Sequence, residues 1–189
     1  PDGQVLSSGH ADGSIHLWRF DASQSLPVVI GDTDDPRSWR ELKGHQKRIA
    51  ESGGLAFSPD GQILTSASYD DTVRLWDWQN EKTNPKVLDQ KGVRLAAFSP
   101  DSRWLASGSN DSSVVLWDTQ TGQKLRTLKG HQNMAFGLQF VDDRLLATTG
   151  FDQTIRLWDV QTGVTRRILQ GHTAGVQGLT SWQEQEKIL

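Results

Sequence analysis

The sequence contains no cysteine, only one methionine and only one tyrosine among its 189 residues. The absence of cysteine excludes disulfide bonds, thiolate zinc sites and catalysis by a thiol. No apolar run approaches the roughly 20 residues that a membrane-spanning helix requires. The stretch from Pro1 to Gly13 is polar and shows no signal-peptide pattern. From these absences we expect a cytoplasmic protein without a membrane partner.

Neither sign of charge dominates the sequence. It has 20 Lys and Arg residues against 23 Asp and Glu residues, which gives a net charge of −3. No basic stripe is visible, so we expect no nucleic-acid partner. Hydrophobic residues make up 35% and charged residues 23%, which is enough for a packed core. Tryptophan is frequent, with eight residues, which suggests that one structural position is used repeatedly.

An internal repeat explains the abundant tryptophan. Trp76, Trp117 and Trp158 are 41 residues apart in nearly identical phrases, and Trp18 precedes Trp76 by 58 residues. An aspartate lies six residues before each of these tryptophans, and a Ser or Thr lies four residues before each aspartate. The aspartates are Asp12, Asp70, Asp111 and Asp152, and the hydroxyl residues are Ser8, Ser66, Ser107 and Thr148. Gly-His pairs occur at Gly44-His45, Gly130-His131 and Gly171-His172.

Each period predicts four short strands separated by Gly and Asp turns. In one unit these strands are expected at Lys124–Leu128, Phe136–Phe140, Leu145–Thr149 and Thr154–Trp158. The last strand is apolar on both faces, which indicates a sheet packed between neighbouring sheets. Turn signals recur too often to leave room for a ten-residue helix. The pattern therefore predicts an all-β protein.

The order Gly-His, Ser or Thr, Asp and Trp-Asp resembles the WD-repeat family over nearly the whole chain. This resemblance implies blades of four antiparallel strands in a β-propeller. The regular Ser-Pro-Asp-Gly and Thr-Gly turns resemble those of propellers in bacterial multidomain signalling proteins. Two departures are visible. Arg19 replaces the first Trp-Asp aspartate, and Leu88-Asp89 stands where the third unit should carry Gly-His. That unit is expected to lack its histidine.

The phase of the repeat divides the chain into units at about 1–42, 43–88, 89–128 and 129–169, and the start of a further unit at 170–189. An insertion is expected at about 21–37. Four blades are few for a ring of this family, so we expect an incomplete, open arc from a larger propeller. The strands predicted at Gln4–Ser8 and Ala174–Thr180 should not pair. A closed four-bladed ring and a half-ring that dimerises are alternatives. Exposed end blades should favour self-association.

The repeated His, Ser and Asp match the residue types of a catalytic triad. However, the set recurs in each unit, Thr148 replaces Ser, and no nucleophile elbow is present. The resemblance implies a structural network instead, in which Asp accepts from His, His donates toward the hydroxyl, and the hydroxyl reaches the Trp indole. The residues assigned to this network are Ser8, Asp12, Trp18, His45, Ser66, Asp70, Trp76, Ser107, Asp111, Trp117, His131, Thr148, Asp152, Trp158 and His172.

The sequence predicts neither an enzyme nor a cofactor. The five histidines have the wrong spacing for a shared metal site. The acidic stretch at 31–35 lacks the glycine and the distal glutamate of a calcium loop. We therefore expect no metal.

Binding is expected on the rim where the Gly-His loops and Asp turns open, because loops on rigid scaffolds carry function. The candidate residues are Lys47, Arg48, Tyr69, Arg94, Asn110, Met134, Phe136, Phe151 and Gln177. Exposed aromatic, Met and Arg residues are typical of protein-binding hot spots. Phe136 and Phe151 could equally pack neighbouring blades. The cations, with Lys91, suit an acidic peptide or phosphate or are solubilising charge.

The sequence thus predicts a non-catalytic scaffold with protein or peptide partners. The alternative is a ligand-binding or enzymatic propeller whose site lies in the central channel or in blades that this sequence lacks.

Overall fold

The computed structural model describes residues 5–19, 38–51, 53–80 and 82–180. Within this part the chain forms antiparallel strands and no helix, which confirms the predicted all-β class. It accordingly contains no helix that could cross a membrane. The expected insertion at about 21–37, the acidic stretch within it and Gln4 lie outside the described residues.

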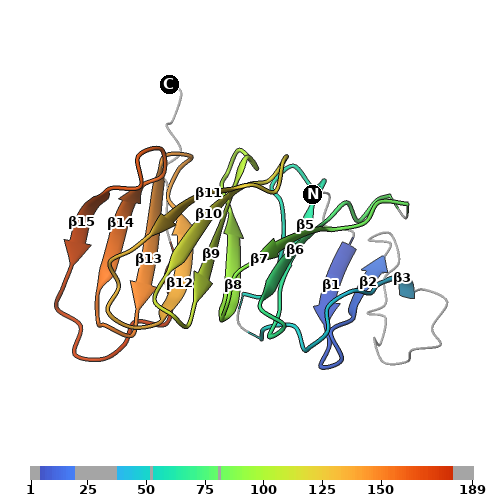
Figure 1. Ribbon diagram of the computed structural model, residues 1–189, viewed down its shortest axis with the longest axis horizontal. Coiled ribbons are helices and arrows are strands. Elements are labelled where there is room, and N and C mark those ends of the chain that lie inside the picture. The colour runs from blue at the N-terminus through green and yellow to red at the C-terminus, as the bar shows by residue number, and fades with distance from the viewer. Residues whose placement is uncertain (1–4, 20–37, 52, 81, 181–189) are drawn as a thin grey trace, which may run out of the picture.

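The strands form four separate sheets in chain order (Figure 1). The first sheet contains β1 (Val5–Gly9), β2 (Ile15–Arg19) and β3 (Ser38–Leu42). The second contains β4 (Leu55–Phe57), β5 (Leu64–Ala67), β6 (Thr72–Trp76) and β7 (Lys86–Asp89). The third contains β8 (Val93–Phe98), β9 (Trp104–Ser109), β10 (Val114–Asp118) and β11 (Lys124–Leu128). The fourth contains β12 (Ala135–Phe140), β13 (Leu145–Gly150), β14 (Ile155–Asp159) and β15 (Thr165–Leu169). We refer to them as blades 1 to 4.

The blades stand side by side in an arc that does not close. Figure 1 shows the sheet of β1 at one end of the molecule and the sheet of β15 at the other. The first strands of neighbouring blades contact each other, β4 with β8 and β8 with β12, so they line the inner side of the arc. The prediction of an open arc is therefore confirmed.

The core lies between the blades rather than within them. On β10, Val115 and Trp117 pack toward blade 2, while Val114 and Leu116 pack toward blade 4. The same alternation places Trp76 against blade 1 and Trp158 against blade 3. Each tryptophan thus packs against the preceding blade, which explains why the Trp strands are apolar on both faces.

Polar contacts join the blades on the rim opposite the Asp turns. The backbone N–H of Asp60 donates to Ser102 Oγ at 3.1 Å, and that of Asp101 donates to Asp143 Oδ1 at 2.9 Å. Each contact links the first turn of one blade to the same turn of the next blade. These bonds connect blades 2, 3 and 4 on that rim.

The predicted inner strand at Ala174–Thr180 is wrong. This segment does not form a strand. Within the described residues, one backbone hydrogen bond connects it to blade 4, from Val176 N–H to Gly150 O at 3.1 Å. An inner strand is stabilised by ladder bonds to the second strand of its own blade, and no such strand follows in the described residues. Residues 174–180 therefore do not pair with β1, whose ladder partner is β2.

Candidate functional site

A continuous hydrogen-bond relay crosses blade 2. Trp76 Nε1 donates to Ser66 Oγ at 2.7 Å, Ser66 Oγ lies 2.7 Å from His45 Nε2, and His45 Nδ1 lies 2.8 Å from Asp70 Oδ2. Thr72 donates through its hydroxyl to Asp70 at 2.7 Å. The relay ties the Gly-His loop to the Asp turn and to the Trp strand.

Blade 4 repeats the relay with Thr in place of Ser. Trp158 Nε1 donates to Thr148 Oγ1 at 2.8 Å, and Thr148 Oγ1 lies 2.7 Å from His131 Nε2. His131 Nδ1 lies 2.9 Å from Asp152 Oδ2, which also accepts the Gln132 N–H at 2.9 Å. A β-branched hydroxyl residue therefore serves as well as serine.

The direction of donation follows from the charge state of the histidines. Burial lowers the pKa of His45 and of His131, so both imidazoles are neutral near pH 7. The indole already donates to the hydroxyl, and a neutral His with Nδ1–H bound to Asp accepts at Nε2. The hydroxyl therefore donates to the histidine, opposite to the direction expected from the sequence.

The two aspartates are anionic ends of the relay. Burial by itself would raise the pKa of Asp70, but hydrogen bonds from Thr72, Gln46 N–H and His45 outweigh it and lower the pKa to about 2. In the same way, bonds from Gln132 N–H, Thr154 and His131 outweigh burial and lower the pKa of Asp152 to about 2.

Blade 3 fills the histidine position with Gln90. Ser107 Oγ donates to Gln90 Oε1 and accepts from Trp117 Nε1 at 2.7 Å. Gln90 is buried and lies 17 residues before Ser107, the same separation as His131 and Thr148. The sequence alignment matched Leu88-Asp89 to Gly-His and so placed Asp89 at the histidine position, one residue before Gln90. Asp111 accepts from Ser113 but lacks a histidine partner.

Blade 1 and the last Gly-His pair depart from the relay. Trp18 Nε1 donates to Ser8 Oγ at 3.0 Å, and Ser8 contacts His10 of the same blade at 3.1 Å. Asp12 accepts from the backbone and hydroxyl of Ser14. His172 is exposed and forms no hydrogen bond within the described residues, so its place in the network stays a prediction. The described residues that follow His172 contain no Asp and Trp at the spacing of the other units.

The relay offers no access to a substrate. Ser66 and Thr148 are fully buried, and each hydroxyl is engaged by a histidine and an indole. A nucleophile must reach the reacting atom, so these hydroxyls serve structure. The described residues also hold no group of three His, Asp or Glu side chains that could bind a metal ion.

The rim above the relays carries a different set of side chains. β-Bulges interrupt the ladders at Arg94, between Val93 and Leu95, and at Phe136, between Ala135 and Gly137. Bulges turn a side chain out of the regular alternation and are frequent next to binding sites. Arg94 thereby contacts Tyr69 and Asn110, and Phe136 contacts Phe151. Tyr69, Asn110 and Phe151 are the residues directly before the turn aspartates.

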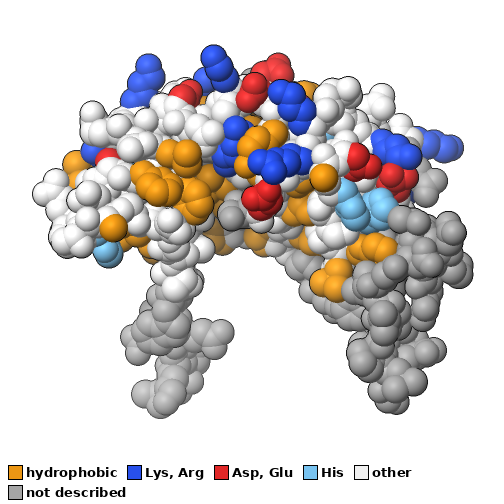
Figure 2. All heavy atoms as spheres, turned by 90° about the horizontal axis from the view of Figure 1, so that it is seen from below, with side chains coloured by type: hydrophobic (Ala, Val, Ile, Leu, Met, Phe, Trp, Pro, Cys, Tyr) orange, Lys and Arg blue, Asp and Glu red, His pale blue; other side chains and the backbone are white. Residues whose placement is uncertain are grey.

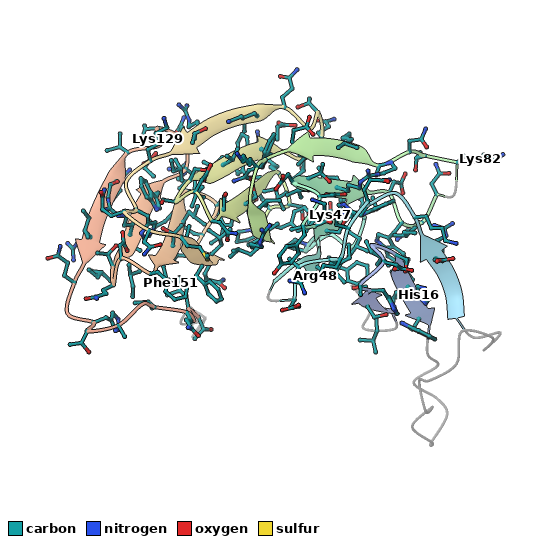
Figure 3. The ribbon with its side chains drawn as sticks, turned by 60° about the horizontal axis from the view of Figure 1, so that its bottom comes forward. His16, Lys47, Arg48, Lys82, Lys129 and Phe151 are labelled. Atoms are coloured by element: carbon teal, nitrogen blue, oxygen red, sulfur yellow. The ribbon has the colours of Figure 1, made fainter. Side chains whose placement is uncertain are left out.

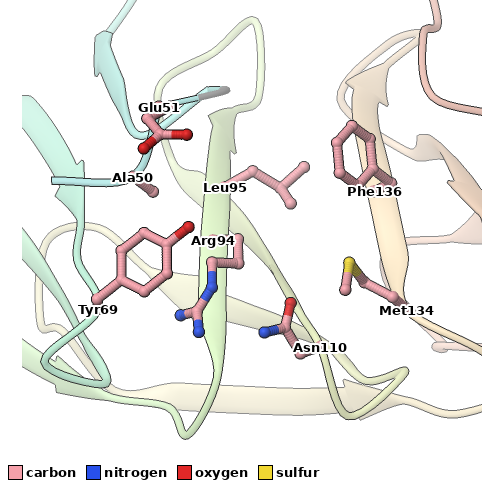
Figure 4. Close-up of a pocket in the computed structure, with 8 residues that line it drawn as sticks. All are labelled: Ala50, Glu51, Tyr69, Arg94, Leu95, Asn110, Met134 and Phe136. Atoms are coloured by element: carbon pink, nitrogen blue, oxygen red, sulfur yellow. The ribbon is translucent and has the colours of Figure 1, made fainter.

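A groove of about 270 Å³ opens where blades 2, 3 and 4 meet (Figure 4). We call it the rim groove, and its lining residues are Ala50, Glu51, Tyr69, Arg94, Leu95, Asn110, Met134 and Phe136. The structure thus brings together five predicted rim residues: Tyr69, Arg94, Asn110, Met134 and Phe136. Figure 2, which views this rim from below, shows basic and apolar side chains gathered together near the middle of the arc.

Tyr69 organises the basic part of the rim groove. The guanidinium carbons of Arg48 and Arg94 lie 4.0 and 3.9 Å from its ring centroid. Such cation–π contacts stabilise by about 0.5–1 kcal/mol at exposed sites. With its amide oxygen facing Arg94, Asn110 accepts from Arg94 Nη2 and Nε at 3.1 and 3.3 Å. Arg48 also pairs with Glu51 at 3.0 Å.

The remaining candidates lie around the rim groove. Phe151 meets Phe136 edge to face with ring centroids 5.3 Å apart, so the two rings do pack together. Lys47, Lys91 and Gln177 are exposed and do not line the groove. Figure 3 shows Lys47, Arg48 and Phe151 on the inner side of the arc, whereas Lys82 and Lys129 lie on the outer side.

Sequence reasoning missed Ala50, Glu51 and Leu95 as lining residues. The first two belong to an insertion in the first strand of blade 2. Ala67 bonds to two residues of this insertion, accepting from Ala50 N–H at 2.9 Å and donating to Gly54 O at 2.7 Å. Glu51, which follows Ala50 in this insertion, lines the groove. The available signal was the separation of His45 and Ser66, which is 21 residues, whereas His131 and Thr148 are separated by 17.

Comparison with known families gives one family match. The model of the WD domain, G-beta repeat family matches residues 1–19, 37–77, 86–118 and 122–159, which is most of the chain. Cell division control protein 4 of Candida albicans is 32% identical over 81 residues, covering 41% of this chain and 11% of that protein. Striatin-4 of Homo sapiens is 42% identical over 71 residues, covering 37% of this chain and 9% of that protein.

A solved structure shares the fold. The crystal structure of RRP9 WD40 repeats matches with a TM-score of 0.65 and 27% identity, covering 71% of this chain and 42% of that chain. The chain therefore spans a small part of the curated relatives and under half of the structural one.

Proposed function

This chain belongs to the WD domain, G-beta repeat family, and from that premise we propose that it is a non-catalytic interaction scaffold whose partner binds the rim groove. Its relatives include a cell division control protein and striatin-4, and a protein-interaction role suits such relatives in general. The cytoplasmic location and the absence of a nucleic-acid partner stay predictions.

The observation that carries this proposal is the composition of the rim groove. Three blades place a Tyr, an Arg, a Met and a Phe around one cavity. These residue types are enriched at the centres of protein interfaces, where a few buried anchors supply most of the binding free energy. The relay beneath the groove holds the supporting loops, so the surface is formed before a partner arrives.

The test compares partner capture by matched variants. The purified chain is immobilised and exposed to an extract, and the retained proteins are compared for wild type, Phe136→Ala and Lys129→Ala. Phe136 lines the groove, whereas Lys129 is exposed and lies on the outer side of the arc. We expect the outer-side variant to retain the same proteins and Phe136→Ala to lose them. Equal retention by all three proteins would exclude the rim groove as the binding surface.

The alternative of a ligand-binding or enzymatic propeller predicts a different result. Small-molecule sites need several convergent polar groups in a cavity that encloses the ligand. In the rim groove the polar side chains are Glu51, Tyr69, Arg94 and Asn110, and three of them already contact a guanidinium. Metabolites that protect the chain thermally while leaving protein capture unchanged would favour this alternative.

A further inference from the structure

We propose that the rim groove recognises a short peptide segment in which an Asp or Glu side chain lies next to a large apolar side chain. This inference rests on the proposed function and adds the chemistry of the partner. The volume of about 270 Å³ is near the lower end of ligand pockets, so the groove holds one or two side chains rather than a folded domain.

The basic half of the rim groove is organised but not neutralised. The guanidinium groups of Arg48 and Arg94 both lie against the Tyr69 ring, so the ring holds each of them in place. Arg94 donates to Val93 O and the Asn110 amide, and it has no ion pair within the described part of the chain. A guanidinium fixed in this way presents its remaining N–H groups to a carboxylate.

The neighbouring carboxylates do not supply the missing charge. Asp70 is engaged by His45, Thr72 and Gln46 in the relay. Asp71 accepts the Gly92 N–H at 2.8 Å. Among the described residues, only Glu51 forms an ion pair with one of these rim cations, Arg48. Lys47 and Lys91 add exposed positive charge nearby, so an acidic ligand meets a locally basic rim on a chain of net charge −3.

The apolar half lies beside these cations on blades 3 and 4. Leu95, Met134 and Phe136 line it, and Phe136 is held by its edge-to-face contact with Phe151. Figure 4 shows Met134 and Phe136 facing Arg94 and Leu95 across the cavity. A ligand side chain inserted here buries apolar surface against an adaptable thioether and an aromatic ring.

Glu51 is an internal competitor for the ligand carboxylate. Its side chain is 72% exposed and that of Arg48 is 49% exposed, so their ion pair is weak and easily exchanged. A bound acidic residue would take over Arg48 and repel Glu51. Removing the Glu51 charge should therefore strengthen binding, which a purely structural role of this residue does not predict.

The experiment selects ligands from a random peptide library displayed on phage, with the full chain as bait. We expect the selected peptides to be enriched in Asp or Glu next to Leu, Phe, Met or Trp. A synthetic copy of the best peptide should bind about tenfold more weakly after Glu→Gln substitution, and more weakly at high salt. Selected peptides without acidic enrichment would overturn the proposal.

Variants of the protein provide the second measurement. Arg94→Met keeps the apolar stem and should weaken binding of the synthetic peptide about tenfold, while Glu51→Gln should strengthen it about threefold. Lys129→Met, on the outer side of the arc, should leave the affinity for the synthetic peptide unchanged. Melting temperatures of all variants separate misfolding from lost contacts. Unchanged affinity for both Arg94→Met and Glu51→Gln would overturn the proposal.

The outcomes distinguish the two levels of the proposal. Binding that depends on Phe136 but not on Arg94 would reject the acidic ligand and keep the scaffold function. Binding independent of both residues would reject both. No selected peptide at all, with protein capture still dependent on Phe136, would reject the peptide ligand and keep the scaffold function. A phosphoserine peptide that binds more than tenfold tighter than its glutamate counterpart would assign the site to phosphorylated partners and overturn the commitment to a carboxylate.

Discussion

Asp152 shows what the relay contributes at the scale of single residues. Its side chain is only 6% exposed and accepts from the backbone of Gln132 and Thr154, the Thr154 hydroxyl and His131. Hydrogen bonds to a charged acceptor contribute about 1.5–3 kcal/mol each, and removing one partner leaves the donors unsatisfied. Asp152 thus fixes a loop, a turn and a strand at once.

Asp152→Ala should lower the free energy of unfolding by about 3 kcal/mol because it leaves His131 and several N–H groups without an acceptor. Asp111→Ala is the matched control, because Asp111 accepts from Ser113 but has no histidine partner. We expect Asp111→Ala to lower the free energy of unfolding by about 1 kcal/mol. Urea unfolding of both variants measures the difference. Equal losses would contradict a stabilising role of the histidine contact.

The same relay makes stability depend on pH in two windows. The pKa of His131 is lowered by burial, so below about pH 6.5 the unfolded chain takes up a proton that the folded chain does not. The free energy of unfolding therefore decreases as the pH decreases. Asp152 has its pKa lowered to about 2 against 3.8 in the unfolded chain. Its contribution is present above about pH 3.8 and is lost as the pH falls toward 2.

His131→Gln should reduce the loss of stability between pH 7 and 5, because glutamine does not titrate. Blade 3 already contains this arrangement, with Gln90 accepting from Ser107. His172→Gln is the matched control, since His172 is exposed and has no contact with the relay. Melting temperatures measured across this range test the idea. It fails if His131→Gln and wild type show the same slope.

At the scale of elements, the inner-strand insertion of blade 2 is a departure from the repeat within the described residues. Ala67 accepts from Ala50 N–H and donates to Gly54 O. Gly53 O accepts from Ala96 N–H of blade 3 at 3.1 Å. The insertion therefore connects two blades while it carries Glu51 into the rim groove. Its shape depends on glycine, because a Cβ at Gly54 would lie 2.1 Å from Ala50 O.

Gly54→Ala should lower the free energy of unfolding by about 1–3 kcal/mol, since the clash is with backbone and not with a flexible side chain. Gly178→Ala is the control because a Cβ there meets nothing within 4 Å, and it should change stability by less than about 0.5 kcal/mol. Denaturant unfolding of both proteins provides the measurement. A neutral Gly54→Ala variant would show that the insertion adapts freely.

Several elements could be predicted because they repeat and their chemistry is local. The strand at Lys124–Leu128 has the expected bounds, since alternation and turn residues determine them. Gln90 was missed because it differs in type from the histidine that it replaces. Glu51 was missed because the longer separation of His45 and Ser66 indicates an insertion but not which of its residues reaches the groove. The stacking of Arg94 on Tyr69 depends on a bulge in the next blade, which the sequence does not mark.

At the scale of the whole molecule, the two ends of the arc present complementary faces. Inside the arc, the Trp face of each blade packs on the aliphatic face of the preceding blade, as Trp158 does near Val114 and Leu116. Blade 1 ends the arc with the Trp face, where Leu6 lies opposite Trp18. Blade 4 ends it with the aliphatic face, where Ile155 lies opposite Leu169. The exposed fractions of Leu6 and Leu169 are 49% and 41%.

These two faces differ from each other, so a contact between them is heterologous and joins copies head to tail. We therefore predict that the isolated chain associates with increasing concentration, because each contact buries the apolar surface that an inner blade buries. Leu6→Lys and Leu169→Lys should each prevent chain growth, since each disables one face. Leu125→Lys, at a residue that is 43% exposed on β11 of an inner blade, is the control and should associate like wild type.

A mixture of the two end variants gives the sharpest test. Leu6→Lys retains the blade 4 face and Leu169→Lys retains the blade 1 face, so one productive contact remains between them. Light scattering should show each variant alone as a monomer and the mixture as a dimer that does not grow further. If the contact were between like faces, one variant alone would still dimerise, because its intact face would find its own copy. Monomeric wild type at all concentrations would show that the exposed faces are too small or too polar to associate.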